Sequence, residues 1–125
     1  MDDYEWADTL RAMYPELFRG CHPANVEVPT GWRKIVGSAM SVFDLMRVKC
    51  DAEVTIAQIK EKFGGLRIYW SGDTDISAVR EVLDAAVMVA ESRAWKTCEV
   101  CGETGKTRGD GWIRTLCDGH AEAGK

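Results

Sequence analysis

Residues 58–70 read Gln58-Ile59-Lys60-Glu61-Lys62-Phe63-Gly64-Gly65-Leu66-Arg67-Ile68-Tyr69-Trp70. Two adjacent glycines flanked by apolar residues predict a two-residue β-hairpin turn, because both central positions of a type I′ turn need positive φ. The expected cross-strand pairs are Phe63 with Leu66, Glu61 with Ile68, and Ile59 with Trp70. A helix from Ile56 to Phe63 is the competing interpretation of the same segment.

The alternation of side chains along the two expected strands separates an apolar face from a polar one. The apolar face holds, with Glu61 as its one exception, Ile59, Phe63, Leu66, Ile68 and Trp70. The opposite face holds Gln58, Lys60, Lys62, Arg67 and Tyr69. Val54 and Ile56 lie in the opposite phase from Ile59, so a strand that extends this far back needs a β-bulge near Ala57.

Helical periodicity appears on both sides of this hairpin. A first helix is expected over residues 4–14, followed by a loop over residues 20–29. A second helix is expected after Thr30, which we assign as its N-cap. The apolar stripe of the second helix contains Trp32, Ile35, Val36, Ala39, Phe43 and Met46.

A third helix is expected from about Ile76 to Ala94, with Thr74 or Asp75 as its N-cap. One apolar face contains Ile76, Val79, Leu83, Ala86, Val87 and Ala90, and it is widened by Val82, Ala85 and Val89. A helix that is apolar over so much of its circumference is typical of a buried position. We therefore expect it to be the central helix.

The five cysteines, at positions 21, 50, 98, 101 and 117, are an odd number, which argues against a disulfide framework and for a reducing compartment. Cys98 and Cys101 form a C-x2-C pair, and Cys117 and His120 form a C-x2-H pair after fifteen intervening residues. This spacing is typical of tetrahedral zinc sites. Four protein ligands leave no open position on the metal, so we expect one structural zinc per chain. The alternatives are a redox pair at Cys98 and Cys101, or cysteines that are simply part of the core.

Between the two ligand pairs, residues 106–116 predict a short hairpin, and residues 117–120 begin a short terminal helix. This order resembles the treble-clef class of zinc finger. The expected fold class is α+β: three helices packed on a small antiparallel β-hairpin, with a C-terminal treble-clef-like zinc module. Residues 1–95 form the core, with the basic hairpin at 58–70, and residues 96–125 form the zinc-binding module, packed as part of a single domain.

The chain has 125 residues, of which 46% are hydrophobic and 29% charged, and this composition suits one compact domain. Sixteen Lys and Arg against twenty Asp and Glu give a net charge of -4, which excludes the overall basic field of a general duplex binder. Residues 31–72, however, carry seven basic and four acidic side chains. No apolar run approaches the roughly 18 residues of a membrane span, and no secretory signal is evident. We expect a soluble, cytoplasmic protein.

The KEKFGGLR string at 60–67, followed by Glu91-Ser92 and the four metal ligands, resembles a group of small uncharacterised proteins encoded by bacteriophages and prophages. The Gly31-Trp32 pair is similar to that group as well, whereas Ile68 replaces its more usual aromatic residue. The resemblance covers about residues 31–120. It implies a phage or prophage origin and action inside a bacterial host cell, and it carries no activity with it.

Three classes of function follow from these features. The first is a non-enzymatic accessory protein that binds and modulates a host or phage protein, which the small size and the structural metal site favour. The second is nucleic-acid binding, since lysines and arginines neutralise phosphates and tyrosine stacks on bases, although a merely solvated face has the same composition. The residues of this second hypothesis are Gln58, Lys60, Lys62, Arg67 and Tyr69, with Arg108 and Arg114 on the zinc hairpin.

The third class is an enzyme, and we expect none. Cys21 and His22 are adjacent in a Pro-rich loop, and adjacency alone does not create the oriented pair that a thiolate mechanism needs. We expect neither a small-molecule substrate nor a membrane partner. Cys21 and Cys50 are expected to be free thiols.

Overall fold

The computed structural model describes residues 2–123, so Met1 and the last two residues of the expected zinc module, Gly124 and Lys125, lie outside the described residues. The helices are α1 (Asp3–Met13), α2 (Arg33–Lys49), α3 (Ser77–Ala94) and α4 (Asp118–Ala123), with short 3₁₀ helices η1 (Pro23–Asn25) and η2 (Thr30–Trp32). The strands are β1 (Glu53–Lys62), β2 (Gly65–Asp73), β3 (Lys106–Arg108) and β4 (Arg114–Leu116). Each strand pair forms a separate antiparallel hairpin. The predicted mixture of helix and sheet is confirmed.

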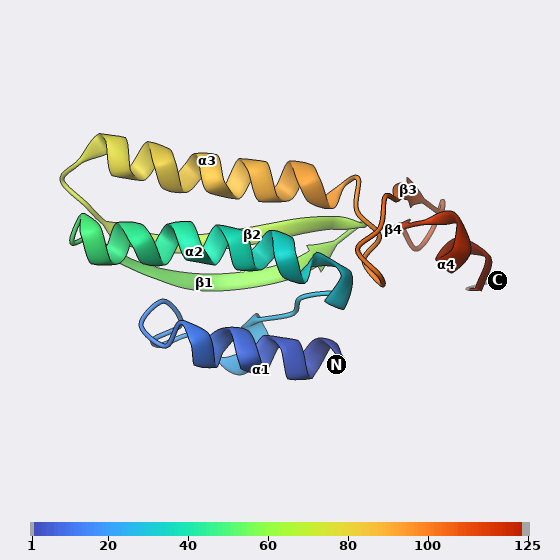
Figure 1. Cartoon of the computed structure of the whole chain (residues 1–125), viewed down its shortest axis with the longest axis horizontal. Coiled ribbons are helices and arrows are strands. Elements are labelled where there is room, and N and C mark those ends of the chain that lie inside the picture. The colour runs from blue at the N-terminus through green and yellow to red at the C-terminus, as the bar shows by residue number, and fades with distance from the viewer. Residues whose placement is uncertain (1, 124–125) are drawn as a thin grey trace.

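The long helices α2 and α3 pack on each other and on the β1–β2 hairpin, while α1 lies on the opposite side of the hairpin from α3 (Figure 1). Each edge of the hairpin carries a contact from another segment: Ile59 O accepts a hydrogen bond from Glu27 N at 2.8 Å, and Ile68 N donates to Glu91 Oε2 at 3.2 Å. The small β3–β4 hairpin and α4 gather at the end of the molecule where β1 turns into β2 (Figure 1).

The register of the β1–β2 hairpin differs from the predicted one. Phe63 and Gly64, with φ of 54° and 80°, form the turn in place of Gly64 and Gly65. The observed pairs are Lys62 with Gly65, Glu61 with Leu66, Lys60 with Arg67 and Ile59 with Ile68. The predicted pairs are therefore wrong by two residues. Because side chains alternate with a period of two, this shift leaves the two faces of the strands intact. It does remove Phe63 from the apolar face, since its side chain is 62% exposed at the turn.

The strand prediction itself is confirmed over the competing helix, and so is the bulge. Ile56 pairs with Trp70 and Gln58 with Tyr69, so that Ala57 is the extra residue. The bulge lets Ile56 and Ile59 both point into the core, although they are an odd number of residues apart.

The core lies between the helices and the apolar face of the hairpin. Its largest fully buried side chains are Trp32, Phe43, Leu10, Leu17, Met40, Ile56, Ile59, Leu66, Leu83, Val28 and Val36. The expected stripe of the second helix is thus largely confirmed. Its expected N-cap is wrong, because η2 precedes α2 and the backbone N–H of Thr30 instead donates to Asp3 Oδ1 at 2.6 Å.

Helix α3 is not central. It buries one stripe, formed by Val79, Leu83, Ala90 and Ala94. Other residues of the expected apolar face are exposed: Val82 by 42%, Val89 by 58% and Ile76 by 52%. The physical reason is that α3 packs mainly on α2 and β2, which lie against one side of it. Ile76 occupies the N-cap position without a side-chain cap, while Thr74 Oγ1 accepts a hydrogen bond from Ile76 N at 3.3 Å. Within residues 2–123, no helix combines the length and the apolar character that crossing a membrane requires.

Candidate metal centre and binding surfaces

The four predicted metal ligands converge at the C-terminal end of the described chain. Cys98 and Cys101 lie on the turn that follows α3, Cys117 follows β4, and His120 lies in α4. Their ligand atoms all lie within 4.8 Å of one another. The sulfurs of Cys101 and Cys117 are 3.8 Å apart, and His120 Nδ1 is 3.6 Å from Cys98 Sγ and 3.2 Å from Cys117 Sγ. All five cysteines lie in the described residues and none forms a disulfide. The four residues constitute a potential metal site.

The backbone around this cluster favours the thiolate form of Cys98. Burial acts to raise the pKa of its thiol, but hydrogen bonds from the backbone N–H groups of Cys117, Cys101 and Val100 outweigh burial and lower the pKa from 9.0 to about 6. At Cys101 a backbone hydrogen bond from Glu103 acts to lower the pKa, whereas desolvation and the neighbouring sulfurs raise it, and the net direction is upward. Neighbouring thiolates repel one another, which disfavours the ionisation of all of them together when no cation is bound. A bound cation offsets this repulsion, so this donor set suits a metal ion.

The turn that carries Cys98 is anchored to the start of α2. Gly31 N donates a hydrogen bond to Glu99 O at 2.8 Å, and Trp32 Nε1 donates to Thr97 O at 2.9 Å. A Cβ atom at Gly31 would lie 2.0 Å from the carbonyl oxygen of Cys98. Only glycine therefore permits this approach of the two backbones.

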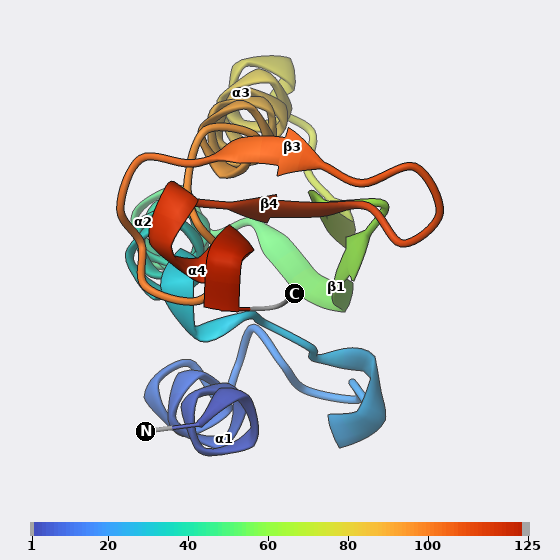
Figure 2. The ribbon, with the colours of Figure 1, turned by 90° about the vertical axis from the view of Figure 1, so that its right-hand side faces the viewer.

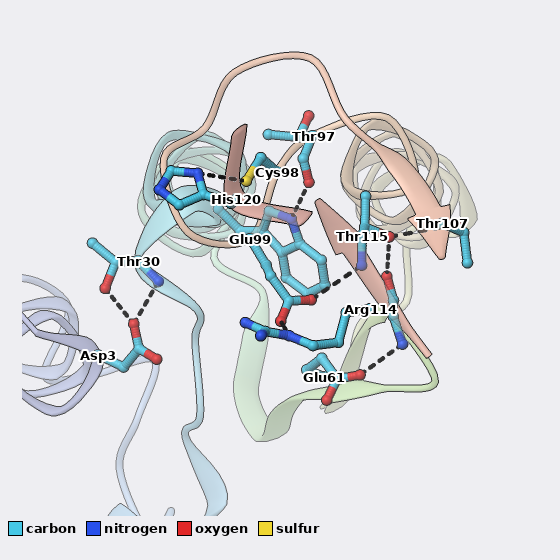
Figure 3. Close-up of polar contacts among 12 residues, drawn as sticks. Asp3, Thr30, Glu61, Thr97, Cys98, Glu99, Thr107, Arg114, Thr115 and His120 are labelled. Atoms are coloured by element: carbon cyan, nitrogen blue, oxygen red, sulfur yellow. Dashed lines mark hydrogen bonds and ion pairs between the residues drawn. The ribbon is translucent and has the colours of Figure 1, made fainter. Parts of the chain in front are cut away.

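A second group of contacts joins the metal-binding segment to the β1–β2 turn. The buried carboxylate of Glu99 accepts hydrogen bonds from Arg114 Nε at 2.6 Å and from Thr115 N at 3.3 Å (Figure 3). Thr115 Oγ1 donates to Gly64 O at 2.7 Å, and Gly64 N donates to Glu61 Oε2, also at 2.7 Å. These contacts connect the segment that carries the potential metal site to the β1–β2 turn.

The β1–β2 hairpin brings five of the predicted nucleic-acid-binding residues to one face. Gln58 pairs with Tyr69 and Lys60 with Arg67, and Lys62 follows on the same face. Lys60 Nζ lies 5.9 Å from the centre of the Tyr69 ring, which is 46% exposed. Among the ion pairs of residues 2–123, none involves Lys60, Lys62 or Arg67. This side of the hairpin, which we call the basic face, has three cations without a carboxylate partner.

The other two predicted residues are engaged within the metal-binding segment. Arg108 Nη2 lies 2.6 Å from Asp118 Oδ1, and the guanidinium holds the pKa of that carboxyl below its ordinary value. Arg114 forms the ion pair with Glu99 described above. Both arginines therefore have acidic partners of their own, unlike the cations of the basic face.

Two exposed aromatic residues at the turns of the hairpins escaped the sequence analysis. Phe63 is 62% exposed at the β1–β2 turn, and Trp112 is 81% exposed in the loop between β3 and β4. That loop lies beside the β1–β2 turn (Figure 2). A hollow of about 480 Å³ lies between the two, lined by Glu61, Lys62, Phe63, Gly111, Trp112 and Ile113. The exposure of Trp112 could have been predicted from the sequence, because Gly109-Asp110-Gly111 directly before it is typical of a turn.

An apolar groove of about 300 Å³ runs between α2 and α3. Its lining includes Val42 from α2 and Val82, Ala85 and Val89 from α3. These α3 residues are the ones that sequence analysis expected to be buried.

Cys21 and His22 do not form a nucleophile and base pair. His22 Nδ1 accepts a hydrogen bond from Ala24 N at 3.0 Å and caps η1, while Cys21 Sγ donates to Ala57 O at 3.5 Å. Burial raises the pKa of the Cys21 thiol, against the smaller effect of Arg11. Each side chain thus has a local structural contact.

No protein-family model, no curated protein and no solved structure matches this chain.

Proposed function

We propose that this chain is a small, zinc-stabilised, non-enzymatic binding protein of phage or prophage type, which binds and modulates a host or phage protein in the bacterial cytoplasm. The observation that supports this proposal is the apolar groove between α2 and α3, bordered by the exposed side chains of Val82 and Val89. Contiguous apolar surface on a small protein is typical of a site that another protein covers.

Zinc is the metal that suits this donor set best. A tetrahedral ion with Zn–S bonds of about 2.3 Å and Zn–N bonds of about 2.0–2.1 Å separates two sulfurs by roughly 3.8 Å and a sulfur from a nitrogen by roughly 3.5 Å. The Cys101–Cys117 separation of 3.8 Å and the Cys98–His120 separation of 3.6 Å are close to these values, and the Cys117–His120 separation of 3.2 Å is shorter. Four ligands on a turn, a hairpin end and a short helix support a structural zinc in a treble-clef-like arrangement.

Metal analysis of the purified protein tests the zinc proposal. We expect one zinc per chain by inductively coupled plasma mass spectrometry, and we expect Cys101→Ser and His120→Ala to lose it. Cys21→Ser serves as the control and retains the metal, because Cys21 lies outside the cluster. Absence of zinc, or full retention by Cys101→Ser, contradicts the proposal.

Affinity capture from a bacterial lysate, with and without nuclease, tests the proposed protein partner. We expect a single protein to remain bound after nuclease and moderate salt, and to be lost with Val89→Glu, which places a charge in the groove. Met88→Glu is the matched control, because Met88 is 68% exposed on the same helix but does not line the groove. Binding that is lost equally in both variants, or in neither, argues against the groove.

Nucleic-acid binding is the second candidate function, and the basic face supports it. Lys60 and Arg67 are cross-strand partners, Lys62 adjoins them, and Tyr69 offers an exposed ring. If the three cations each neutralise one phosphate of a single strand, a plot of the logarithm of the binding constant against the logarithm of the salt concentration should have a slope of about -2. Captured material that disappears with nuclease and elutes at low salt would favour this function over the first.

A further inference from the structure

We propose that the turns of the two hairpins form a stacking platform for a single-stranded nucleic acid, with bases lying against Phe63 and Trp112. This inference rests on the second candidate function above and specifies its ligand. Four observations support it: the exposure of both rings, the backbone conformation of Phe63, the hollow between the rings and the distribution of cations.

The exposure of these two rings is not a consequence of loose structure. Thr115 Oγ1 donates to Gly64 O at 2.7 Å, and a Cβ at Gly64 would lie 3.3 Å from the Ile113 side chain. The two turns are therefore packed together. Phe63 and Trp112 nevertheless remain 62% and 81% exposed. Such large aromatic surfaces on fixed turns gain nothing from the core of this chain.

The backbone at Phe63 is an independent observation. Phe63 has a φ of 54°, in the left-handed region that asparagine and glycine tolerate and bulky residues avoid. Strain of this kind persists where the side chain serves a purpose other than packing. The register of the hairpin thus holds Phe63 in an unfavourable conformation with its phenyl ring exposed, where a ligand can contact it.

The two rings border an open hollow of about 480 Å³ on the surface of the molecule. Its wall also contains Lys62, which belongs to the basic face as well. A chain that enters the hollow can therefore continue along the basic face.

The cations and the exposed rings together favour a single strand as the ligand. Each exposed ring of the two hairpins lies beside a cation: Lys60 Nζ is 5.9 Å from the Tyr69 ring, Lys62 Nζ is 5.7 Å from Phe63 and Arg114 Cζ is 5.8 Å from Trp112. Alternating π faces and cations are the recognition elements of single-strand binders. A duplex hides its base faces, and three unpaired cations on a protein of net charge -4 attract its backbone weakly.

Fluorescence anisotropy with a fluorescein-labelled oligothymidylate at low salt tests the platform. We expect Trp112→Ala and Phe63→Asn each to weaken binding by roughly 5- to 150-fold, and Trp112→Phe to retain most of it because a phenyl ring also stacks. Met13→Ala is the control. Met13 is 55% exposed and ends α1, whose C-terminal end lies away from the two turns (Figure 1). Circular dichroism of each variant establishes that it is folded.

The outcomes separate the platform from the function on which it rests. If Lys60→Gln and Arg67→Gln weaken binding while Phe63→Asn and Trp112→Ala do not, the platform is overturned and binding by the basic face stands. Equal or tighter binding of a duplex of the same length also overturns the platform. If the native protein binds no oligonucleotide at low salt, both the platform and the second candidate function fail.

Discussion

At Gly31 two backbones approach so closely that a single methyl group decides whether they fit. A Cβ there would lie 2.0 Å from Cys98 O and 2.6 Å from the carbonyl carbon of Glu99. Neither atom belongs to a flexible side chain, so the steric clash can be relieved only if the turn that carries Cys98 and Glu99 moves away from α2. Gly31 thus connects the segment that carries the potential metal site to the core.

Gly31→Ala is expected to lower the free energy of unfolding by about 1–3 kcal/mol, the usual effect of overpacking. Urea unfolding followed by fluorescence measures it. Gly37→Ala is the matched control, because a Cβ at Gly37 of α2 meets nothing within 4 Å and alanine favours a helix by about 0.5–1 kcal/mol. If both variants are equally stable, the close approach at Gly31 is not as described.

Phe63→Asn is expected to raise the free energy of unfolding by about 1 kcal/mol, because asparagine tolerates the left-handed backbone that phenylalanine resists. Thermal unfolding measures this change. Phe63→Val is the control and should destabilise the fold, since a β-branched residue is least suited to a φ of 54°. A loss of stability in Phe63→Asn would show that the exposed ring contributes to folding after all.

Cys21 gives a pH-dependent prediction. Burial raises the pKa of its thiol above the ordinary 9.0. The folded state therefore favours the protonated thiol, and this contribution to stability is present below pH 9 and is lost as the pH rises through the folded-state pKa. Iodoacetamide labelling at Cys21, followed by peptide mass spectrometry, should reach half its maximal rate at a higher pH in the folded protein than in urea. Identical profiles would contradict the raised pKa.

Among the elements, the two hairpins depend on each other through one hydroxyl group. Thr115 is fully buried in β4, and its Oγ1 supplies the hydrogen bond to Gly64 O in the β1–β2 turn. Thr115→Val keeps the shape but leaves that carbonyl without this donor, so we expect a loss of about 1–3 kcal/mol in unfolding free energy.

Chemical denaturation measures this loss, with Thr107→Val as the control. Thr107 is exposed and its hydroxyl contacts only the Thr115 hydroxyl, at 3.4 Å, so a small effect is expected. Equal effects of the two substitutions would indicate that the contact between the hairpins contributes little.

Element prediction from sequence succeeded where the local pattern was strong. The apolar stripe of α2, the β1–β2 hairpin and the bulge at Ala57 all follow from periodicity and turn residues. The register failed because Gly64-Gly65 is the pair that suits a type I′ turn locally, whereas the observed turn at Phe63-Gly64 depends on the packing of Gly65. A Cβ at Gly65 would lie 2.5 Å from the Trp95 ring, a contact between distant parts of the chain.

At the scale of the whole molecule, metal removal should separate the chain into a stable and an unstable part. Helix α4 has six residues and cannot persist alone, and β3 and β4 have three residues each. We expect a chelator to remove hydrogen-exchange protection from residues 97–123 while β1, β2 and α3 keep theirs.

Hydrogen exchange followed by mass spectrometry measures this difference, with the same chelator added to Cys101→Ser as the control. That variant should lack metal already and show no further change. Unchanged protection of residues 97–123 in the native protein after complete metal loss would show that the contacts of Gly31, Trp32 and Thr115 are sufficient without the ion.

The sequence by itself determined the four residues of the potential metal site, the apolar stripes and the residues of the basic face, because residue spacing and the periods of helices and strands are local properties. Only the tertiary structure decided that Val82 and Val89 face a groove, that Arg114 pairs with Glu99, and that Phe63 and Trp112 lie on neighbouring turns. These are contacts between segments far apart in the chain. Their geometry depends on how the elements pack, and no local pattern encodes that packing.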